Sequence, residues 1–290
     1  MMVYLQILID GILLGGLYAV MAMGFSVIWG VMNIINLAHG SMIILGAYIT
    51  YWLWKEWGID PFATIPISGG ALFCFGFLLQ KYLLNRIVAA SVFLALIVTF
   101  GLDMVLTNAH LALFEADLRA VHTSYSSESL TIGSLHIAYT RLAVFGAAVA
   151  LTLLLLAFMN RTRTGNAIKA TSFDVEAAEL AGMNTARIYS ITFGIGAMMA
   201  GIAGSLIASV FSFSPVGSIP LTTKSFVVVV LGGLGSIPGA IAGGLLLGIA
   251  EDYTAYWEPG YIELVSFGLL LVVLLVRRRG LFGKRFYAEV

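Results

Sequence analysis

Long apolar runs separated by short polar connections make up most of this 290-residue chain. A run of about 20 apolar residues can cross a lipid bilayer as an α-helix, because a helix satisfies its backbone N–H and C=O groups internally. The pattern therefore predicts an all-α, polytopic membrane protein with about eight membrane segments. We place these segments at 5–31, 40–54, 61–80, 87–107, 142–159, 188–212, 224–250 and 262–276.

Two of these segments are irregular. The run 40–54 is short, and the run 224–250 contains GGLGSIPGAIAGG, whose glycines and proline are unfavourable inside one continuous helix. The 27 residues of 224–250 are also too few for two full spans. We therefore expect a broken or re-entrant pair of half-helices there.

The composition supports a membrane location. Hydrophobic residues make up 60% of the chain and charged residues only 10%, and the mean hydropathy is +0.99. A soluble domain carries about a quarter charged residues, so this chain cannot cover itself in water. The single cysteine, Cys74, excludes an intramolecular disulfide. The sequence contains no phosphate-binding loop, zinc motif or nucleophile elbow. We expect no catalytic residues, metal, cofactor or nucleic-acid partner.

The basic residues indicate which connections are cytoplasmic. Eleven of the 15 Lys and Arg fall in two loops and the C-terminal tail: Lys81, Arg86, Arg161, Arg163, Lys169, Arg187, Arg277, Arg278, Arg279, Lys284 and Arg285. By the positive-inside rule, the loop 160–187 and the C-terminus are cytoplasmic. The acidic, Ser/Thr-rich loop 108–140 then lies outside, where it could form a small ordered flap. The orientation of the N-terminus depends on whether 5–54 crosses twice or contains a re-entrant piece, and the sequence leaves this open.

A polar cluster interrupts the first long apolar region. The stretch NIINLAHGSMIILGAY contains Asn33, Asn36, His39 and Gly40 within an otherwise apolar sequence. Such residues satisfy freed backbone groups where one helix ends and the next begins, and they can also line a transport pathway. The pattern predicts a helix break here and favours the capping role without excluding the pathway role.

The second interruption has a similar character. It contains Gly232, Gly233, Gly235, Pro238 and Gly239. Paired interrupted segments in the two halves of a chain indicate a transport pathway at a repeat interface, although glycines also serve close helix packing.

Three charged positions lie in or beside apolar segments. Lys224 precedes the second interruption and could contact a substrate carboxylate or a partner at the outer face, or extend to the membrane interface as lysines commonly do. Glu251 follows the interruption and could pair with a partner or be solvated. Asp103 is a costly carboxylate within a predicted span, and we expect it to face protein, water or the membrane boundary.

The loop 160–187 contains a predicted short amphipathic helix at 173–182. Asp174 suits its N-terminus, an apolar face follows, and Gly182 ends the helix. That face consists of Ala177, Ala178, Leu180 and Ala181. A helix of small residues could occupy a groove on a partner, or the loop could be an ordinary connector.

Three motifs resemble one transporter family. EAAELAG, from Glu176 to Gly182, is similar to the EAA loop by which permeases of ABC importers contact their ATPases. RTRTGNAIKATSFDVEAAELAGMN, GVMNIINLAHGSMIILGAY and KSFVVVVLGGLGSIPGAIAGGLLLGIAE resemble the branched-chain amino acid ABC permeases, specifically their LivH-type member. The chain lacks the Ile-x-Leu-Pro that follows the EAA motif in other importers.

The resemblance implies a single transmembrane permease domain over 1–290, in a multi-pass protein of the bacterial inner membrane. It implies transport of branched-chain or related amino acids by alternating access. The implied partners are a homologous LivM-type permease, two cytosolic ABC ATPases and a periplasmic substrate-binding protein. Residues Asp174, Glu176, Ala177, Ala178 and Gly182 would contact an ATPase. The alternatives are a permease for urea or short amides, and a self-contained secondary transporter.

Overall fold

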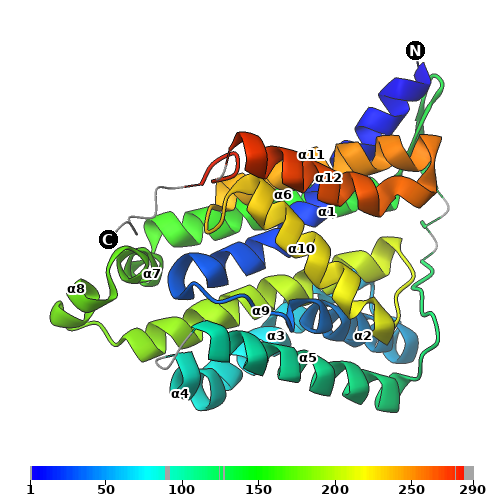
Figure 1. The fold of residues 1–290 in the computed structure, drawn as a ribbon. Helices are drawn as coiled ribbons and strands as arrows, with labels where there is room; N and C mark the ends of the chain where they lie inside the picture. Colours follow the sequence, from blue (N-terminus) through cyan, green and yellow to red (C-terminus); the bar gives the residue numbers. More distant parts are fainter. Residues whose placement is uncertain (1, 89–91, 124, 127, 278, 284–290) are drawn as a thin grey trace.

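α-Helices dominate the structure, as the sequence predicts (Figure 1). The computed structural model describes residues 2–88, 92–123, 125–126, 128–277 and 279–283. The helices are α1 (Met2–Met32), α2 (His39–Trp57), α3 (Pro61–Leu79), α4 (Asn85–Val88), α5 (Val92–Phe114), α6 (Tyr139–Arg161), α7 (Arg163–Phe173), α8 (Val175–Leu180), α9 (Thr185–Val210), α10 (Ser218–Gly232), α11 (Ile237–Trp257) and α12 (Ile262–Val276). A π-helical turn (Gln80–Leu84) follows α3, and 3-10 turns (Pro215–Gly217, Pro259–Tyr261) precede α10 and α12.

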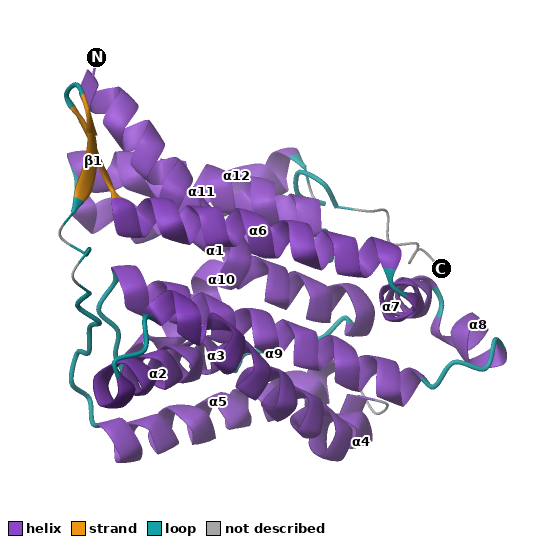
Figure 2. Cartoon of the chain, turned by 180° about the vertical axis from the view of Figure 1, so that it is seen from behind, coloured by secondary structure: helices purple, strands orange, loops and turns teal. Residues whose placement is uncertain are grey.

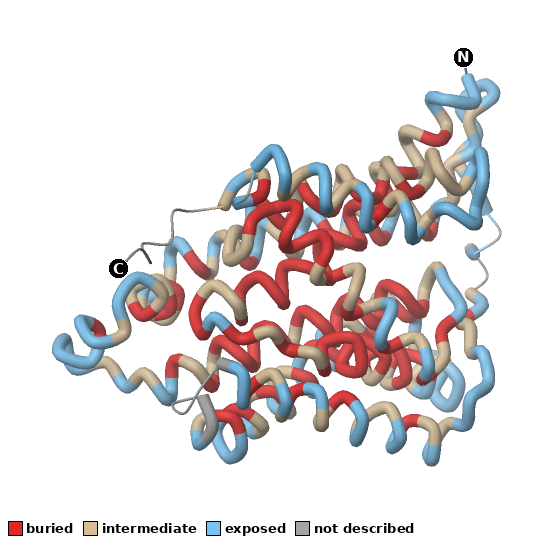
Figure 3. Tube along the Cα trace, viewed as in Figure 1, coloured by how far each residue is buried: buried red, intermediate tan, exposed pale blue. Residues whose placement is uncertain are grey.

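Seven helices in the described part of the chain are long and apolar enough to cross a membrane: α1, α3 with its π turn, α5, α6, α9, and α10 and α12 with their 3-10 turns. The segments of α1 and α9 are almost wholly buried at the centre of the bundle, whereas α5, α6 and α12 lie at its periphery (Figure 3). The peripheral helices expose large apolar side chains, which are stable against lipid tails. The chain is therefore a multi-pass membrane protein.

The two ends of the bundle differ. An antiparallel hairpin of β1 (Ser129–Ile132) and β2 (Leu135–Ala138) lies at one end, which we call the hairpin end; α7 and α8 lie at the other, the loop end (Figure 2). The hairpin confirms that the predicted flap is ordered. The connection is shorter than the predicted 108–140, because α5 continues to Phe114 and α6 begins at Tyr139.

The irregular segments have wider bounds than their sequences suggest. The predicted run 40–54 is the 19-residue helix α2. The predicted run 224–250 is two helices, because α10 begins at Ser218 and α11 ends at Trp257. The predicted break is present between α10 and α11, although α11 is long for a half-helix, since its 21 residues extend about 32 Å at 1.5 Å per residue. The sequence pattern missed these extensions because polar residues at both ends interrupt the apolar run.

Small residues bring the central helices close together. A Cβ on Gly15 of α1 would lie 2.6 Å from the Leu245 Cα of α11, and a Cβ on Gly244 would lie 2.7 Å from the Ala19 backbone nitrogen. The α3–α9 pair has the same character, since a Cβ on Gly201 would lie 2.9 Å from the Ser68 carbonyl oxygen. The packing role of the mid-helix glycines is thus confirmed at these positions.

The two halves of the bundle are arranged alike. α1 packs on α11 as α9 packs on α3, α2 contacts α3 and α5, and α10 contacts α11 and α12. The series α1, α2, α3 and α5 therefore corresponds to α9, α10, α11 and α12. In this alignment the segment 33–38, which follows α1, corresponds to 211–217, which follows α9. The sequence had paired the first interruption with 232–239 instead.

Replacement of Gly15 by valine tests the close α1–α11 contact. Gly15→Val should destabilise the protein by about 1–3 kcal/mol, because the new side chain meets backbone that cannot move aside. Thermal unfolding of the purified protein in lipid nanodiscs measures the loss. Gly146→Val is the matched control, since a Cβ at Gly146 meets nothing within 4 Å. Equal melting temperatures for the two variants would contradict the close contact.

Candidate functional site

Two asparagines hold the backbone of the first helix break. Asn33 adopts a left-handed conformation (φ 52°), and its N–H donates to the Trp29 carbonyl at 2.9 Å, which ends α1. Asn36 is fully buried, and its side-chain oxygen accepts from the Ala38 N–H at 3.2 Å. The Asn36 side chain and the Asn33 backbone therefore complete hydrogen bonds at the break.

His39 and Gly40 join the break to the rest of the bundle. His39 is fully buried, and its Nε2 donates to the Met21 carbonyl at 2.9 Å, so the start of α2 lies beside the middle of α1. The Gly40 N–H donates to the Thr222 hydroxyl of α10 at 2.8 Å. A Cβ on Gly40 would overlap the Ser218 carbonyl oxygen. The N-termini of α2 and α10 thus meet, and glycine is required where they touch.

A buried polar cluster surrounds this meeting point. The Ser41 hydroxyl of α2 donates to the Asp103 carboxylate of α5, and it lies 3.2 Å from the Thr107 hydroxyl. Thr107 in turn lies 3.1 Å from the hydroxyl of Ser218, the first residue of α10. Asp103 is only 7% exposed. The sequence leads us to expect Asp103 to face protein, water or the membrane boundary. In the structure its carboxylate faces protein.

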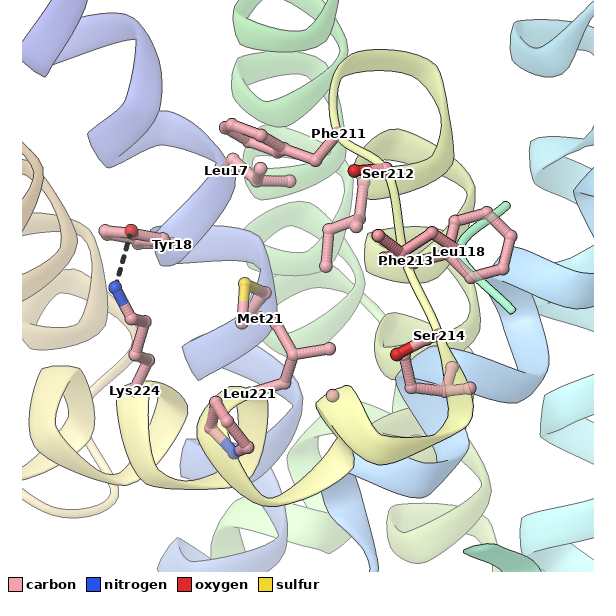
Figure 4. Close-up of a pocket in the computed structure, with 14 residues that line it drawn as sticks. Leu17, Tyr18, Met21, Leu118, Phe211, Ser212, Phe213, Ser214, Leu221 and Lys224 are labelled. Carbon is pink, nitrogen blue, oxygen red and sulfur yellow. Dashed lines mark hydrogen bonds between the residues drawn. The ribbon is translucent and has the colours of Figure 1, made fainter. Parts of the chain in front are cut away.

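A cavity of about 360 Å³ lies beside the meeting point, between α1, α2, α10 and the segment 211–217 (Figure 4). Its lining includes Leu118 of the connection that carries the hairpin, so it lies toward the hairpin end. The wall is largely apolar, with Lys224 and Tyr18 on one side and Ser212 and Ser214 on another (Figure 4). The further lining residues are Leu17, Met21, Ile44, Ile207, Phe211, Phe213, Gly217, Pro220 and Leu221.

Lys224 belongs to a buried ionic network. Its Nζ lies 2.7 Å from a Glu251 carboxylate oxygen and 3.2 Å from the Tyr18 hydroxyl. Tyr18 donates to the same Glu251 oxygen at 2.5 Å, and Ser266 donates to the other at 2.6 Å. Glu251 is 4% exposed in its side chain and Lys224 is 19% exposed. Lys224 is therefore not an interfacial residue extending into solvent, and Glu251 is not solvated, which corrects both simple expectations.

The second interruption lies elsewhere. Gly233 and Gly235 have positive φ angles of 105° and 76°, and the Ser236 hydroxyl accepts from the Gly239 N–H at 3.1 Å to start α11. Pro238 lies in the first turn of that helix, and Gly232 packs directly on Gly239. The N–H groups of residues 281 and 282 donate to the carbonyls of residues 231 and 232 at 2.9 and 2.8 Å. None of these glycines lines the cavity described above.

The segment 211–217 lines the cavity instead, and sequence reasoning did not identify it. Its sequence, FSFSPVG, alternates aromatic and hydroxyl residues and contains Pro215. That alternation is the one sequence signal by which this segment could have been identified. The network partners Tyr18 and Glu251 were also missed as a pair, because they come from helices far apart in the sequence.

The predicted helix in the loop 160–187 is present. α8 covers Val175–Leu180, the Asp174 side chain accepts from the Ala177 N–H at 2.9 Å, and Gly182 ends the turn with φ 81°. Ala178 is buried, whereas Glu176, Ala177 and Leu180 are exposed, Leu180 to 90%. The helix thus presents an unpaired surface beyond the bundle (Figure 1).

Comparison with known proteins identifies the family of this chain. A sequence model described as "Branched-chain amino acid transport system / permease component" matches residues 7–274. The chain is 33% identical to the high-affinity branched-chain amino acid transport system permease protein LivH of Escherichia coli K12, and the match covers 97% of this chain and 96% of the relative. It is 31% identical to BraD of Pseudomonas aeruginosa, with the same coverage. The LivM protein of E. coli K12 is 27% identical over 91% of this chain and 67% of the relative. No solved structure matches.

Removal of the Ser41 hydroxyl tests the cluster at the helix N-termini. Ser41→Ala leaves the buried Asp103 carboxylate without its donor, so we expect a loss of about 1–3 kcal/mol in the free energy of unfolding. The measurement is chemical or thermal unfolding in nanodiscs. Ser26→Ala is the control, because the buried Ser26 hydroxyl has no hydrogen-bond partner in the described part of the chain. Ser26→Ala should be neutral, and equal losses in both variants would contradict the role of Ser41.

Proposed function

Since this chain belongs to the family of branched-chain amino acid transport permeases, we propose that it is the membrane-spanning permease subunit of an ABC importer in a bacterial inner membrane. Its cargo is leucine, isoleucine, valine or a related amino acid. The observation that carries the proposal is the family match over residues 7–274, which includes both helix breaks, the cavity and α8. Like its relatives, the chain is a transport subunit, and partner subunits hydrolyse ATP.

The proposed assembly contains a second permease. The chain is similar to both LivH and LivM proteins, which supports a pair of homologous subunits side by side. Two cytosolic ATPases and a periplasmic substrate-binding protein complete the importer. The binding protein delivers substrate at the hairpin end, where the cavity lies.

The proposed ATPase contact is α8 with its flanking residues. Asp174 fixes the start of the helix, Gly182 fixes its end, and Glu176 and Ala177 lie exposed between them, whereas Ala178 packs inward. The 90% exposure of Leu180 supports a partner, because a large apolar side chain held in water gains free energy by burial. A loop that served only as a connector would not require an exposed leucine at this position.

The proposed orientation puts the loop end in the cytoplasm. Arg161, Arg163, Lys169 and Arg187 lie there, and Arg277 and Arg279 follow α12 at the same end. Arg278, Lys284 and Arg285 lie outside the described residues. The hairpin end and the N-terminus are then external, and the C-terminus is cytoplasmic.

Alternating access would centre on the meeting of α2 and α10. Their N-termini are joined through Gly40 and Thr222, beside the cavity. Movement of the ATPases against α8 would separate or rejoin these helices. The cavity would then open to one side at a time, and substrate would move through without chemical change.

The structure disfavours a self-contained secondary transporter. Such a protein needs a coupling carboxylate exposed to its pathway. Asp103 accepts from Ser41 and does not line the cavity. A permease for urea or short amides would work by the same mechanism. The ligand of the binding protein distinguishes that alternative from an amino acid importer.

A charge reversal on α8 tests the ATPase contact. In proteoliposomes with the complete importer, Glu176→Lys should lower ATP-driven leucine uptake by about tenfold or more, because a buried like-charge contact costs several kcal/mol. Insertion and pairing of the permeases should be unchanged. Lys81→Glu, a charge reversal at an exposed residue outside α8 and away from the hairpin end, is the control. Normal uptake by Glu176→Lys would refute the docking role.

Labelling of single cysteines tests the orientation. In a Cys74→Ala background, we expect Ser134→Cys in the hairpin turn to react with an impermeant maleimide added outside intact spheroplasts. Ala181→Cys after α8 should react only after the membrane is permeabilised. Both positions are exposed, so accessibility within the protein is matched. The reverse pattern would invert the proposed topology.

A further inference from the structure

The cavity near the hairpin end has one cationic side and otherwise apolar walls. We propose that Lys224 is the carboxylate anchor of a substrate site in this cavity, where its Nζ binds the carboxylate of a neutral aliphatic α-amino acid. The substrate's side chain packs on the apolar wall. This inference rests on the proposed function and assigns the substrate chemistry to specific residues.

The hydrogen bonds of Lys224 leave room for a substrate. A lysine ammonium has three N–H donors. Glu251 accepts one at 2.7 Å and the Tyr18 hydroxyl accepts a second at 3.2 Å, which leaves the third donor free within the described part of the chain. Lys224 lines the cavity, whereas Glu251 does not. A carboxylate that enters the cavity therefore meets the cation first.

Glu251 orients this anchor. A buried ammonium without a partner is costly, and the Glu251 carboxylate at 2.7 Å from Nζ offsets that cost. Tyr18 and Ser266 fix the carboxylate from α1 and α12. The negative charge of Glu251 also weakens the binding of a substrate carboxylate to Lys224. Weak binding suits a transport site, because the substrate must leave it again.

The size and lining of the cavity favour a small aliphatic zwitterion. Its volume of about 360 Å³ lies near the lower end of the range of small-molecule sites. Leu17, Met21 and Leu221 provide apolar wall for a branched side chain. Ser212 and Ser214 add hydroxyl groups to the side of the cavity away from Lys224 (Figure 4). Cationic amino acids are disfavoured by the lysine, and urea or an amide has no carboxylate for it.

A charge-balanced pair of substitutions separates this role from a structural one. Lys224→Met alone leaves the buried Glu251 without a cationic partner and could fail to fold. The double variant Lys224→Met/Glu251→Gln removes both charges together, and Lys224→Arg keeps the cation. Each variant is placed in the complete importer, and two rates are measured with saturating loaded binding protein: uptake of leucine and hydrolysis of ATP.

We expect the double variant to assemble and to keep the stimulation of ATP hydrolysis by the binding protein, while leucine uptake falls by about tenfold or more. Lys224→Arg should retain more uptake than the double variant. Uptake within about twofold of the unmodified importer in the double variant would show that the ion pair only links helices, and would overturn the inference.

A second measurement uses the folded protein and does not require loss of either charge. Ser212 is exposed in the cavity lining, so Ser212→Cys in a Cys74→Ala background reports on occupancy through its reaction with a maleimide. Leucine at millimolar concentration should slow labelling, whereas leucinol, which has no carboxylate, should not. Equal protection by both compounds, or protection by neither, would overturn the inference. Lack of leucine uptake by the unmodified importer would instead refute the proposed function itself.

Discussion

Each backbone N–H and C=O group that enters a lipid bilayer needs a hydrogen-bond partner inside the protein, and this requirement organises the whole bundle. A continuous helix such as α1 meets it alone. A broken helix cannot, so each interruption needs partners from neighbouring elements. Asn33 and Asn36 serve the first break, and Ser236 serves the second. The Thr222 hydroxyl serves Gly40 across the interface. The polar side chains of Asn36, Thr222 and Ser236 are therefore placed where helices are interrupted.

The same requirement explains how much of the structure the sequence could predict. The membrane spans follow from local apolar runs, and the caps at Asn33, Asp174 and Gly182 follow from residue types at helix ends. These features could therefore be predicted from the sequence. The resemblance of the motifs to a permease family was confirmed over nearly the whole chain. The roles of the individual site residues stay predictions.

The cavity could not be predicted from the sequence, because it depends on which helices become neighbours. Lys224 and Glu251 are 27 positions apart and face each other only because the chain reverses between α10 and α11. The segment 211–217 was overlooked for a similar reason. Its importance arises from the correspondence between the two halves of the bundle, which residue identity does not display. The glycines of 232–239 were predicted to form a helix break or part of a pathway, and in the structure they make a tight reversal at the loop end.

The contact between α10 and the segment after α12 has a consequence for biogenesis. The last carbonyls of α10 accept hydrogen bonds from Leu281 and Phe282, which are synthesised two helices later. A chain is synthesised N-terminus first, so α10 is made before these donors exist. The reversal at Gly233 therefore reaches its final form only after α12 and the segment that follows it have been synthesised. Because α1 packs on α11 and α3 packs on α9, completion of the central packing of the bundle is likewise a late step of synthesis.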